Sequence, residues 1–282
     1  MWTSFKEDKN DTVHELIALT PEDQMLNVAI EAAEDAGERL LRIFKGSKLS
    51  VRRKYDYPGS IVTNADEASE RIIFNRIKRS GIKSTINSEE AGTISLGSRK
   101  VLWAVDPLDG TLNYAKRIPH FAVSIGILVH NKTVAGVIYN PVLNEMFTVS
   151  RESGACLNGK RIRVSRTRSL RNSILIFEWW NPEPAIPDPL DFLKGLYRFT
   201  RSIRSPGSVA LNLCSVAAGR FDGLVTVFRE SPVYEIAAGC LLIEEASGRV
   251  TNSSGRSWEG FSGSIVAGGA EIHRQLLSRL RS

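Results

Sequence analysis

The sequence predicts a mixed protein in which an α+β first half is followed by an α/β second half. Two amphipathic helices come first, short strands separated by turn residues follow, and strands then alternate with helices to the end of the chain. Such alternation is typical of a sheet covered by helices. A basic run after a turn predicts the boundary, with residues 1–165 in the first half and residues 166–282 in the second.

The first predicted helix begins at Pro21 and ends before Gly46. Thr20 supplies a capping hydroxyl, Pro21 suits the first helical position, and apolar residues recur at helical spacing. A second helix is predicted over residues 64–80, because isoleucines mark one side of this segment and a glycine follows it. Residues 1–19 are polar and predict a loose extension or a short extra helix.

The middle of the chain is rich in β-forming residues and predicts an antiparallel meander packed on these two helices. One short strand is expected to end at residue 86. Four more are expected over 101–105, 121–129, 134–139 and 146–149. In the second half, strands are expected over 173–177, 202–204, 221–228 and 264–267, and helices over 192–199, 207–218, 231–246 and 271–280. A cluster of prolines predicts a loop over 181–189.

The stretch 103–111 is the clearest candidate for a functional site. An apolar strand runs into Asp106, and Pro107 is expected to stop the strand there. Asp109 then adds a second carboxylate, and Gly110 lets a ligand approach the backbone. A helix starting at the next residue would offer free amides to a phosphate. Carboxylates for a divalent metal beside amides for an anion predict phosphoryl transfer, although an ordinary surface turn uses the same residue types.

Composition argues against several other classes of function. The 282 residues carry a net charge of +6, but the basic residues are spread along the chain, which favours a solvated face over a nucleic-acid groove. The three cysteines predict neither a disulfide framework nor a metal motif, and the four histidines match neither a Ser–His–Asp nor a zinc spacing. The polar N-terminus and the lack of a long apolar run predict a cytoplasmic protein with no membrane partner.

Five segments together resemble the inositol monophosphatase family of magnesium-dependent, lithium-sensitive sugar phosphatases, in the family's motif order. The stretch 103–114, WAVDPLDGTLNY, is similar to the family's signature. Segments 61–66 and 87–92 are similar to its upstream acidic motifs, and segments 207–211 and 234–239 to its downstream ones. The resemblance covers about residues 22–280. It implies the layered α/β/α/β/α sandwich of a superfamily that also contains the fructose-1,6-bisphosphatases.

The resemblance also implies a magnesium site of at least two ions. The first ion would be held by Glu89, Asp106 and the carbonyl of Leu108. The second would be held by Asp106, Asp109 and Glu235, and a third, weaker ion would lie near Glu89. Magnesium prefers such hard oxygen ligands, and two ions can stabilise both the entering and the leaving oxygen of a displacement.

Roles toward water and substrate follow from the same resemblance. Asp66 and Thr111 would orient and deprotonate the attacking water, with Glu89 as the third catalytic residue. The amides of Gly110 and Thr111, beside Asp109, would take the phosphate. The alcohol portion of the substrate would be lined by Gly207, Ser208 and Val209. The expected partner is a small phosphorylated polyol or sugar, and the chain is expected to form a homodimer.

Departures from the family pattern bear on the substrate. Glu235 stands where most members have Asp and fructose-bisphosphatases have Glu, and Leu112 replaces a usual Thr. Glu230 is a candidate for contact with inositol hydroxyls, whereas Arg204 and Arg229 are candidates for binding a second phosphate. The predicted substrate is inositol-1-phosphate. The alternatives are fructose-1,6-bisphosphate, alone or as a second substrate, 3′-phosphoadenosine 5′-phosphate and, in a different class, the role of an inactive ligand-binding relative.

Overall fold

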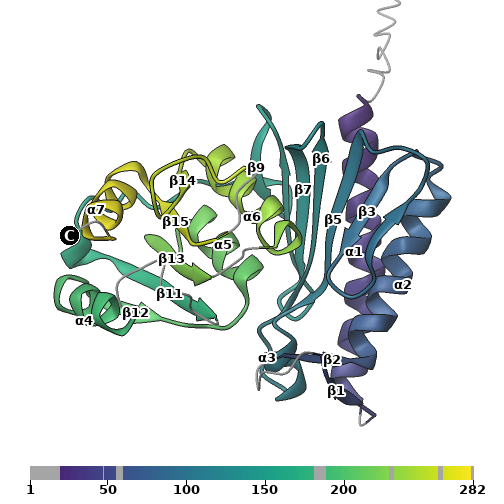
Figure 1. Ribbon diagram of the computed structural model, residues 1–282, viewed down its shortest axis with the longest axis horizontal. Coiled ribbons are helices and arrows are strands. Elements are labelled where there is room, and N and C mark those ends of the chain that lie inside the picture. The colour runs from purple at the N-terminus through teal and green to yellow at the C-terminus, as the bar shows by residue number, and fades with distance from the viewer. Residues whose placement is uncertain are drawn as a thin grey trace, which may run out of the picture.

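A computed structural model describes residues 20–46, 48–54, 60–180, 189–228, 232–259 and 263–280. Within them, helices and sheets form five layers in the order helix, sheet, helix, sheet, helix (Figure 1). Helices α1 and α2 cover one face of an eight-stranded sheet, and α5 and α6 lie between that sheet and a five-stranded one. Helices α4 and α7 pack on the outer face of the second sheet. The layered sandwich is therefore confirmed.

The first two helices start at capping boxes that the sequence encodes. Helix α1 (Pro21–Lys45) begins after Thr20, whose hydroxyl accepts from the Asp23 amide at 3.1 Å. Helix α2 (Asn64–Arg79) begins after Thr63 in the same way. Small apolar side chains of α1 pack against isoleucines of α2 and against the sheet, in one buried cluster. Both helices lie within a residue of their predicted bounds.

The eight-stranded sheet has the order β10-β9-β8-β7-β6-β5-β3-β4 and is antiparallel except between β3 and β5. Its strands are β3 (Thr85–Ser88), β4 (Gly92–Ser95), β5 (Val101–Asp109), β6 (Ala122–Val129), β7 (Lys132–Asn140), β8 (Glu145–Ser150), β9 (Gly154–Leu157) and β10 (Lys160–Arg161). The predicted antiparallel meander is confirmed from β5 to β8, whereas β3, the strand that includes residue 86, pairs with β5 in parallel. Strands β4, β9 and β10 were not predicted, nor was the hairpin of β1 (Val51–Arg53) and β2 (Ile61–Thr63).

The prediction that Pro107 stops the strand is wrong. Asp106 still pairs with Ser124 and Asp109 with Ala122, and the register shifts between the two pairs. A proline is tolerated at such an irregularity, because no partner there requires its missing amide hydrogen. The Leu108 amide turns inward instead and donates to Asp106 Oδ1 at 3.0 Å. The irregularity directs both carboxylates to one end of the sheet.

The five-stranded sheet has the order β12-β11-β13-β15-β14, with β11, β12 and β13 parallel. Its strands are β11 (Ile174–Trp180), β12 (Ser202–Arg204), β13 (Gly223–Phe228), β14 (Arg249–Asn252) and β15 (Ile265–Gly268). Its helices are α4 (Pro189–Phe199), α5 (Val209–Ala217), α6 (Val233–Glu245) and α7 (Ala270–Leu280). Strand β14 was not predicted. The predicted extension at 1–19 and the loop at 181–188 lie outside the described residues, and Pro189 belongs to α4 rather than to that loop.

Helix α6 lies very close to the first sheet because two glycines face it. Gly126 and Gly136 are cross-strand partners at the centre of the sheet. A Cβ atom built on Gly126 would lie 2.9 Å from the Ala237 Cβ, and one built on Gly136 would lie 2.8 Å from the Ala238 Cβ. Without side chains at these positions the helix backbone approaches the strands closely. This packing fixes the helix whose first turn carries Glu235.

Candidate active site

Asp109, the last residue of β5, connects this strand to the start of α5. Its carboxylate accepts hydrogen bonds from the amides of Val209 at 3.2 Å and Ala210 at 2.9 Å. The Ser208 hydroxyl donates to it as well. Burial raises the pKa of Asp109 to about 6, while these donors favour the charged form and oppose the rise. The predicted phosphate-site carboxylate and the predicted Ser208–Val209 segment are therefore in contact.

Asp66 contacts both the start of α2 and Thr111. Its Oδ2 accepts from the Thr63 amide at 2.8 Å and from the Thr63 hydroxyl at 2.6 Å. Its Oδ1 lies 3.3 Å from the Thr111 hydroxyl, which also lies 3.0 Å from the Leu108 carbonyl oxygen. Burial raises the pKa of Asp66 to about 7 despite the hydrogen bonds from Thr63. A carboxyl group that titrates near neutral pH thus touches the predicted catalytic hydroxyl.

The predicted helix after Gly110 is present and is short, as α3 (Thr111–Ala115). Gly110 precedes it with φ of 91°, a left-handed conformation that favours glycine. A Cβ atom there would also lie 2.9 Å from the His120 carbonyl oxygen. The first amides of α3 and the hydroxyl of Thr111 consequently lie at the same corner as the carboxylates.

Lys54 bridges the two glutamates of the second predicted motif. Its ammonium group donates to Glu89 Oε1 at 3.1 Å, to the Glu89 carbonyl at 3.0 Å and to Glu90 Oε1 at 2.9 Å. Burial lowers the pKa of this lysine, but the two carboxylates outweigh burial and the net shift is upward. The Glu89 amide donates to the Val105 carbonyl at 3.1 Å, which places Glu89 beside β5.

Glu235 lies close enough to Glu89 and Asp109 for their charges to affect its pKa. It lies in the first turn of α6 and is half-buried. Burial and then the charges of Glu89 and Asp109 raise its pKa well above the ordinary value. Burial raises the pKa of Asp106 in the same way, followed by the charges of Glu89, Asp109 and Glu235. Four carboxylates from three separate motifs therefore act on one another across one region.

These carboxylates are close but do not converge on one point. Among the described residues, no three acidic, histidine or cysteine side chains are placed so as to hold a metal ion as they stand. Lys54 engages Glu89, while Ser208 and the α5 amides engage Asp109. The donor chemistry still fits magnesium, because every candidate ligand is a hard oxygen and neighbouring carboxylates add to burial in raising the pKa values of Asp106 and Glu235.

The loop before α5 packs directly against α3. Asn113 Nδ2 donates to the carbonyl oxygens of Pro206 at 2.9 Å and Gly207 at 3.2 Å. Ser208 caps α5 by accepting from the Leu211 amide at 3.4 Å. The predicted substrate segment 207–209 therefore lies between α3 and the buried Asp109.

Arg204 lies on the edge strand β12 and is exposed. Its guanidinium group is turned back along its own strand, toward the Ser202 hydroxyl and the Ile203 carbonyl oxygen. It lines an open groove of about 850 Å³ whose other lining residues include Trp179, Tyr197 and Gly207. The other two predicted rim residues, Arg229 and Glu230, lie outside the described residues, so their part of the bisphosphate hypothesis stays a prediction.

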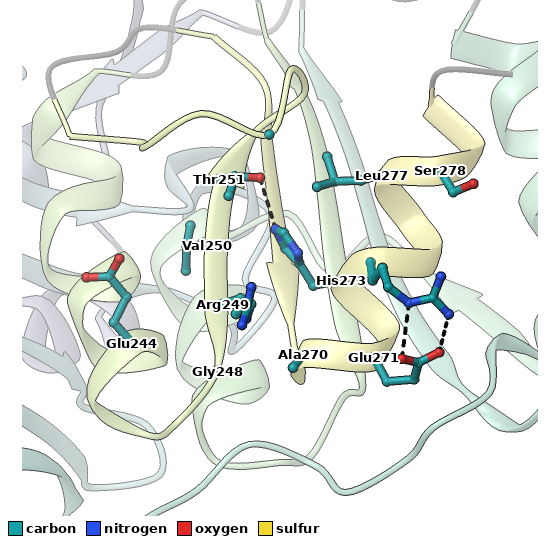
Figure 2. A pocket seen from close by; sticks show the side chains of 12 residues that line it. Glu244, Gly248, Arg249, Val250, Thr251, Ala270, Glu271, His273, Leu277 and Ser278 are labelled. Carbon is teal, nitrogen blue, oxygen red and sulfur yellow. Dashed lines mark hydrogen bonds and ion pairs between the residues drawn. The ribbon is translucent and has the colours of Figure 1, made fainter.

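A further pocket of about 920 Å³ lies apart from these carboxylates, between α6, β14 and α7 (Figure 2). Figure 2 shows the buried His273 ring beside Thr251 and the ion pair between Glu271 and Arg274. None of the predicted site residues lines this pocket. Its size therefore does not mark it as the place of the chemistry.

Sequence reasoning missed two residues of the site. Lys54 directly follows two other basic residues in the sequence, and no motif separates it from them. Glu178 lies at the end of β11 and accepts a hydrogen bond from the Gly207 amide at 2.8 Å. A signal for Glu178 was available, since it is the only acidic residue within the otherwise apolar strand ILIFEWW.

Comparison with known proteins agrees with this geometry. The model of the inositol monophosphatase family matches residues 22–282. The chain belongs to the inositol monophosphatase family. It is 36% identical over 258 residues to the Nus factor SuhB of Escherichia coli K12, a match that covers 91% of this chain and 96% of SuhB.

Two solved structures of family members show the same fold. The extragenic suppressor protein SuhB from Bartonella henselae is 36% identical, with a TM-score of 0.84, and covers 92% of this chain and 98% of its own. Inositol monophosphatase from Anabaena (Nostoc) sp. PCC 7120 is 35% identical, with a TM-score of 0.81, and covers 93% of this chain and 97% of its own.

Membership of the family makes this chain a metal-binding phosphatase that acts on a phosphorylated substrate. SuhB from Bartonella henselae and the inositol monophosphatase from Anabaena are about equally similar to it. Family membership therefore defines the reaction type and leaves the substrate to be determined. Within the described residues, every helix is too short or too polar to cross a bilayer.

Proposed function

We propose that this chain hydrolyses the phosphate monoester of a small polyol or sugar in a magnesium-dependent reaction, with inositol-1-phosphate as the principal substrate. The contact between Asp66 and Thr111 carries the proposal, because it pairs a carboxylate and a hydroxyl beside a group of buried acids. Such a pair can accept a proton from water near neutral pH, so that no covalent nucleophile is needed.

The metal ligands we propose are the acids that share this corner. Glu89, Asp106 and the Leu108 carbonyl would hold one magnesium ion, and Asp106, Asp109 and Glu235 a second, with a third ion near Glu89. Bound magnesium would supply positive charge to the phosphate and lower the pKa of water. The mutual electrostatic repulsion of these carboxylates supports the assignment, since cations relieve it.

Other groups of the chain would bind the attacking water, its proton, the phosphate and the alcohol portion of the substrate. Thr111 donates its hydroxyl hydrogen toward Asp66 or the Leu108 carbonyl, so its oxygen can accept a hydrogen bond from water and orient it. Asp66 would then take up the proton that the water releases. The amides of Gly110 and Thr111 would bind phosphate oxygens at the start of α3. Gly207, Ser208 and Val209 would line the alcohol portion.

Two substrates other than inositol-1-phosphate fit particular residues. Glu235 in place of the usual Asp favours fructose-1,6-bisphosphate, and Arg204 and Arg229 would suit its second phosphate. A third candidate substrate within the family is 3′-phosphoadenosine 5′-phosphate. An inactive ligand-binding relative is disfavoured, because such a protein would not need four acids that repel one another in a shared, partly buried region.

Phosphate release from a panel of these three esters, with and without magnesium, tests the proposal. We expect magnesium-dependent release that is fastest, as kcat/KM, for inositol-1-phosphate. Preference for fructose-1,6-bisphosphate would favour the first alternative, and preference for the nucleotide would favour the second. No release from any ester at saturating magnesium would support the inactive relative.

A further inference from the structure

We propose that Glu178 is a positioning residue that fixes the start of α5 and, through it, the orientation of Asp109 toward magnesium. The inference rests on the proposed function, because it takes Asp109 as a metal ligand. Glu178 touches none of the groups proposed to react. It acts through the loop 205–208, which connects β12 to α5.

Glu178 accepts three hydrogen bonds through its carboxylate. Its side chain is buried, with 8% of the residue exposed. Oε2 accepts from the Ser205 hydroxyl at 2.8 Å. Oε1 accepts from the Gly207 amide at 2.8 Å and from Asn212 Nδ2 at 2.9 Å. A buried carboxylate is stable only with such partners, so these three donors are held tightly around it.

The three donors to Glu178 lie on both sides of Ser208 along the chain. Ser205 and Gly207 belong to the loop, and Asn212 lies one turn into α5, where its amide donates to the Ser208 carbonyl at 3.0 Å. Glu178 therefore holds the chain on both sides of the Ser208 cap. Asn113 of α3 holds the carbonyl side of the same loop. The loop that leads into α5 is therefore held between α3 and β11.

The orientation of the Asn212 amide is consistent with this arrangement. Its Oδ1 is buried, and besides Glu178 the Asn212 side chain interacts with the ring of His120. The contact of its Nδ2 with Glu178 favours this orientation of the amide, because the flipped amide would place an oxygen against a carboxylate. Glu178 therefore sets the first turn of α5 as well as the loop.

The start of α5 contacts the candidate active site directly. The Ser208 hydroxyl and the amides of Val209 and Ala210 all donate to Asp109. These donors follow Gly207 directly in sequence, so a shift of the Gly207 amide moves them together. Losing Glu178 would therefore change where the Asp109 oxygens lie. The fold would keep the two sheets, whose cores do not depend on this carboxylate.

Glu178→Ala tests the proposal through magnesium binding, measured by isothermal titration calorimetry on the metal-free full-length chain. We expect the magnesium Kd to rise about tenfold and the magnesium concentration for half-maximal phosphate release to rise in parallel. Glu178→Gln should restore both values, because its oxygen can accept from Gly207 and Asn212 and its amide can donate to Ser205. Glu178→Asp, whose side chain is one methylene shorter, should behave like the alanine variant and serves if that variant does not fold.

Asp222 provides a matched control at the opposite end of β11. Its carboxylate accepts from the Ile174 amide at 2.7 Å and from the Ser165 hydroxyl, far from the loop. Asp222→Ala should lower Tm and leave the magnesium Kd unchanged. The positioning role is overturned if Glu178→Ala or Glu178→Asp binds magnesium as the wild type does, or if Asp222→Ala weakens binding equally. A wild-type chain that binds no magnesium would overturn the proposed function itself.

Discussion

Ser208 donates its hydroxyl hydrogen to Asp109 across 99 positions of sequence. The donor begins a helix that lies against the second sheet, and the acceptor ends a strand of the first sheet. The amide of Ala210 strengthens the same connection at 2.9 Å. The candidate site is therefore assembled only when both sheets pack on the central helices, and neither sheet contains it alone.

Asp106→Asn is expected to reduce kcat by more than tenfold at saturating magnesium, because Asp106 is the proposed ligand of two ions. The fold should remain, and Tm without magnesium should not fall, since the change removes a charge that Glu89, Asp109 and Glu235 repel. Steady-state kinetics and thermal unfolding check both points. A variant that keeps more than a tenth of the wild-type kcat would contradict the two-metal assignment.

Thr111→Ala should lower kcat more than it raises KM. The hydroxyl contacts Asp66 and the Leu108 carbonyl, so its loss misplaces the attacking water rather than the phosphate. Thr111→Ser keeps the hydroxyl and should retain most of the activity. Steady-state kinetics with inositol-1-phosphate measure both variants. An effect on KM alone would mean that Thr111 only binds substrate.

Replacing Arg204 and Arg229 together with alanine tests the second-phosphate hypothesis. If they bind that group, KM for fructose-1,6-bisphosphate should rise at least tenfold, about 1.4 kcal/mol, while KM for inositol-1-phosphate stays nearly unchanged. In the structure Arg204 is exposed and turned toward its own strand, so it would have to change rotamer to reach a ligand. Equal effects on both substrates, or none, would count against the hypothesis.

Gly136→Ala is expected to destabilise the fold by about 1–3 kcal/mol, as overpacking of a tight core does. The added methyl group would lie 2.8 Å from the Ala238 Cβ, so α6 would have to move away from the sheet. Chemical denaturation measures the loss. Gly81→Ala is a useful comparison, because an added Cβ there meets no neighbouring atom and its cost comes from backbone conformation alone.

His273 makes stability depend on pH. The ring is 4% exposed and its Nε2 lies 2.9 Å from the Thr251 hydroxyl oxygen. Burial and then the charge of Arg249 lower its pKa from 6.5 to about 4. The folded protein keeps the ring neutral, while the unfolded chain protonates it below about pH 6.5. Unfolding therefore takes up a proton, and stability falls as pH falls from about 6.5 to about 4.

His273→Gln removes this titration and should flatten the pH dependence by up to about 3 kcal/mol over that interval. The difference between variant and wild type is the informative quantity, because raised carboxyl pKa values elsewhere contribute with the opposite sign. Denaturant unfolding at several pH values measures it. Parallel profiles for the two proteins would show that His273 does not titrate in this range.

The sequence predicted the elements whose signals are local. The capping residues of α1 and α2 and the long apolar strands β6 and β7 needed only periodicity and helix-start chemistry. The acidic motifs were found by resemblance, and the structure brings Asp66 and Thr111 into contact. These features share one property, which is that neighbours along the chain define them.

Features that depend on distant partners were not predictable. Strand β9 is short and half-buried, and β14 is an edge strand whose pairing with β15 defines it. The continuation of β5 through Pro107 depends on pairing with β6, which propensity alone does not contain. Lys54 gains its role from groups 35 and 36 positions away, and Glu178 gains its role from groups 27 to 34 positions away.

The two oxygens of Asp66 are committed to different tasks. One belongs to the capping box of α2, and the other meets Thr111. Helix ends are where local opening begins, well below the temperature of global unfolding. Here such fraying would carry the proposed proton acceptor away from its hydroxyl partner. Moderate heating should therefore abolish catalytic activity reversibly, at temperatures where most backbone amide hydrogens are still protected from exchange with solvent.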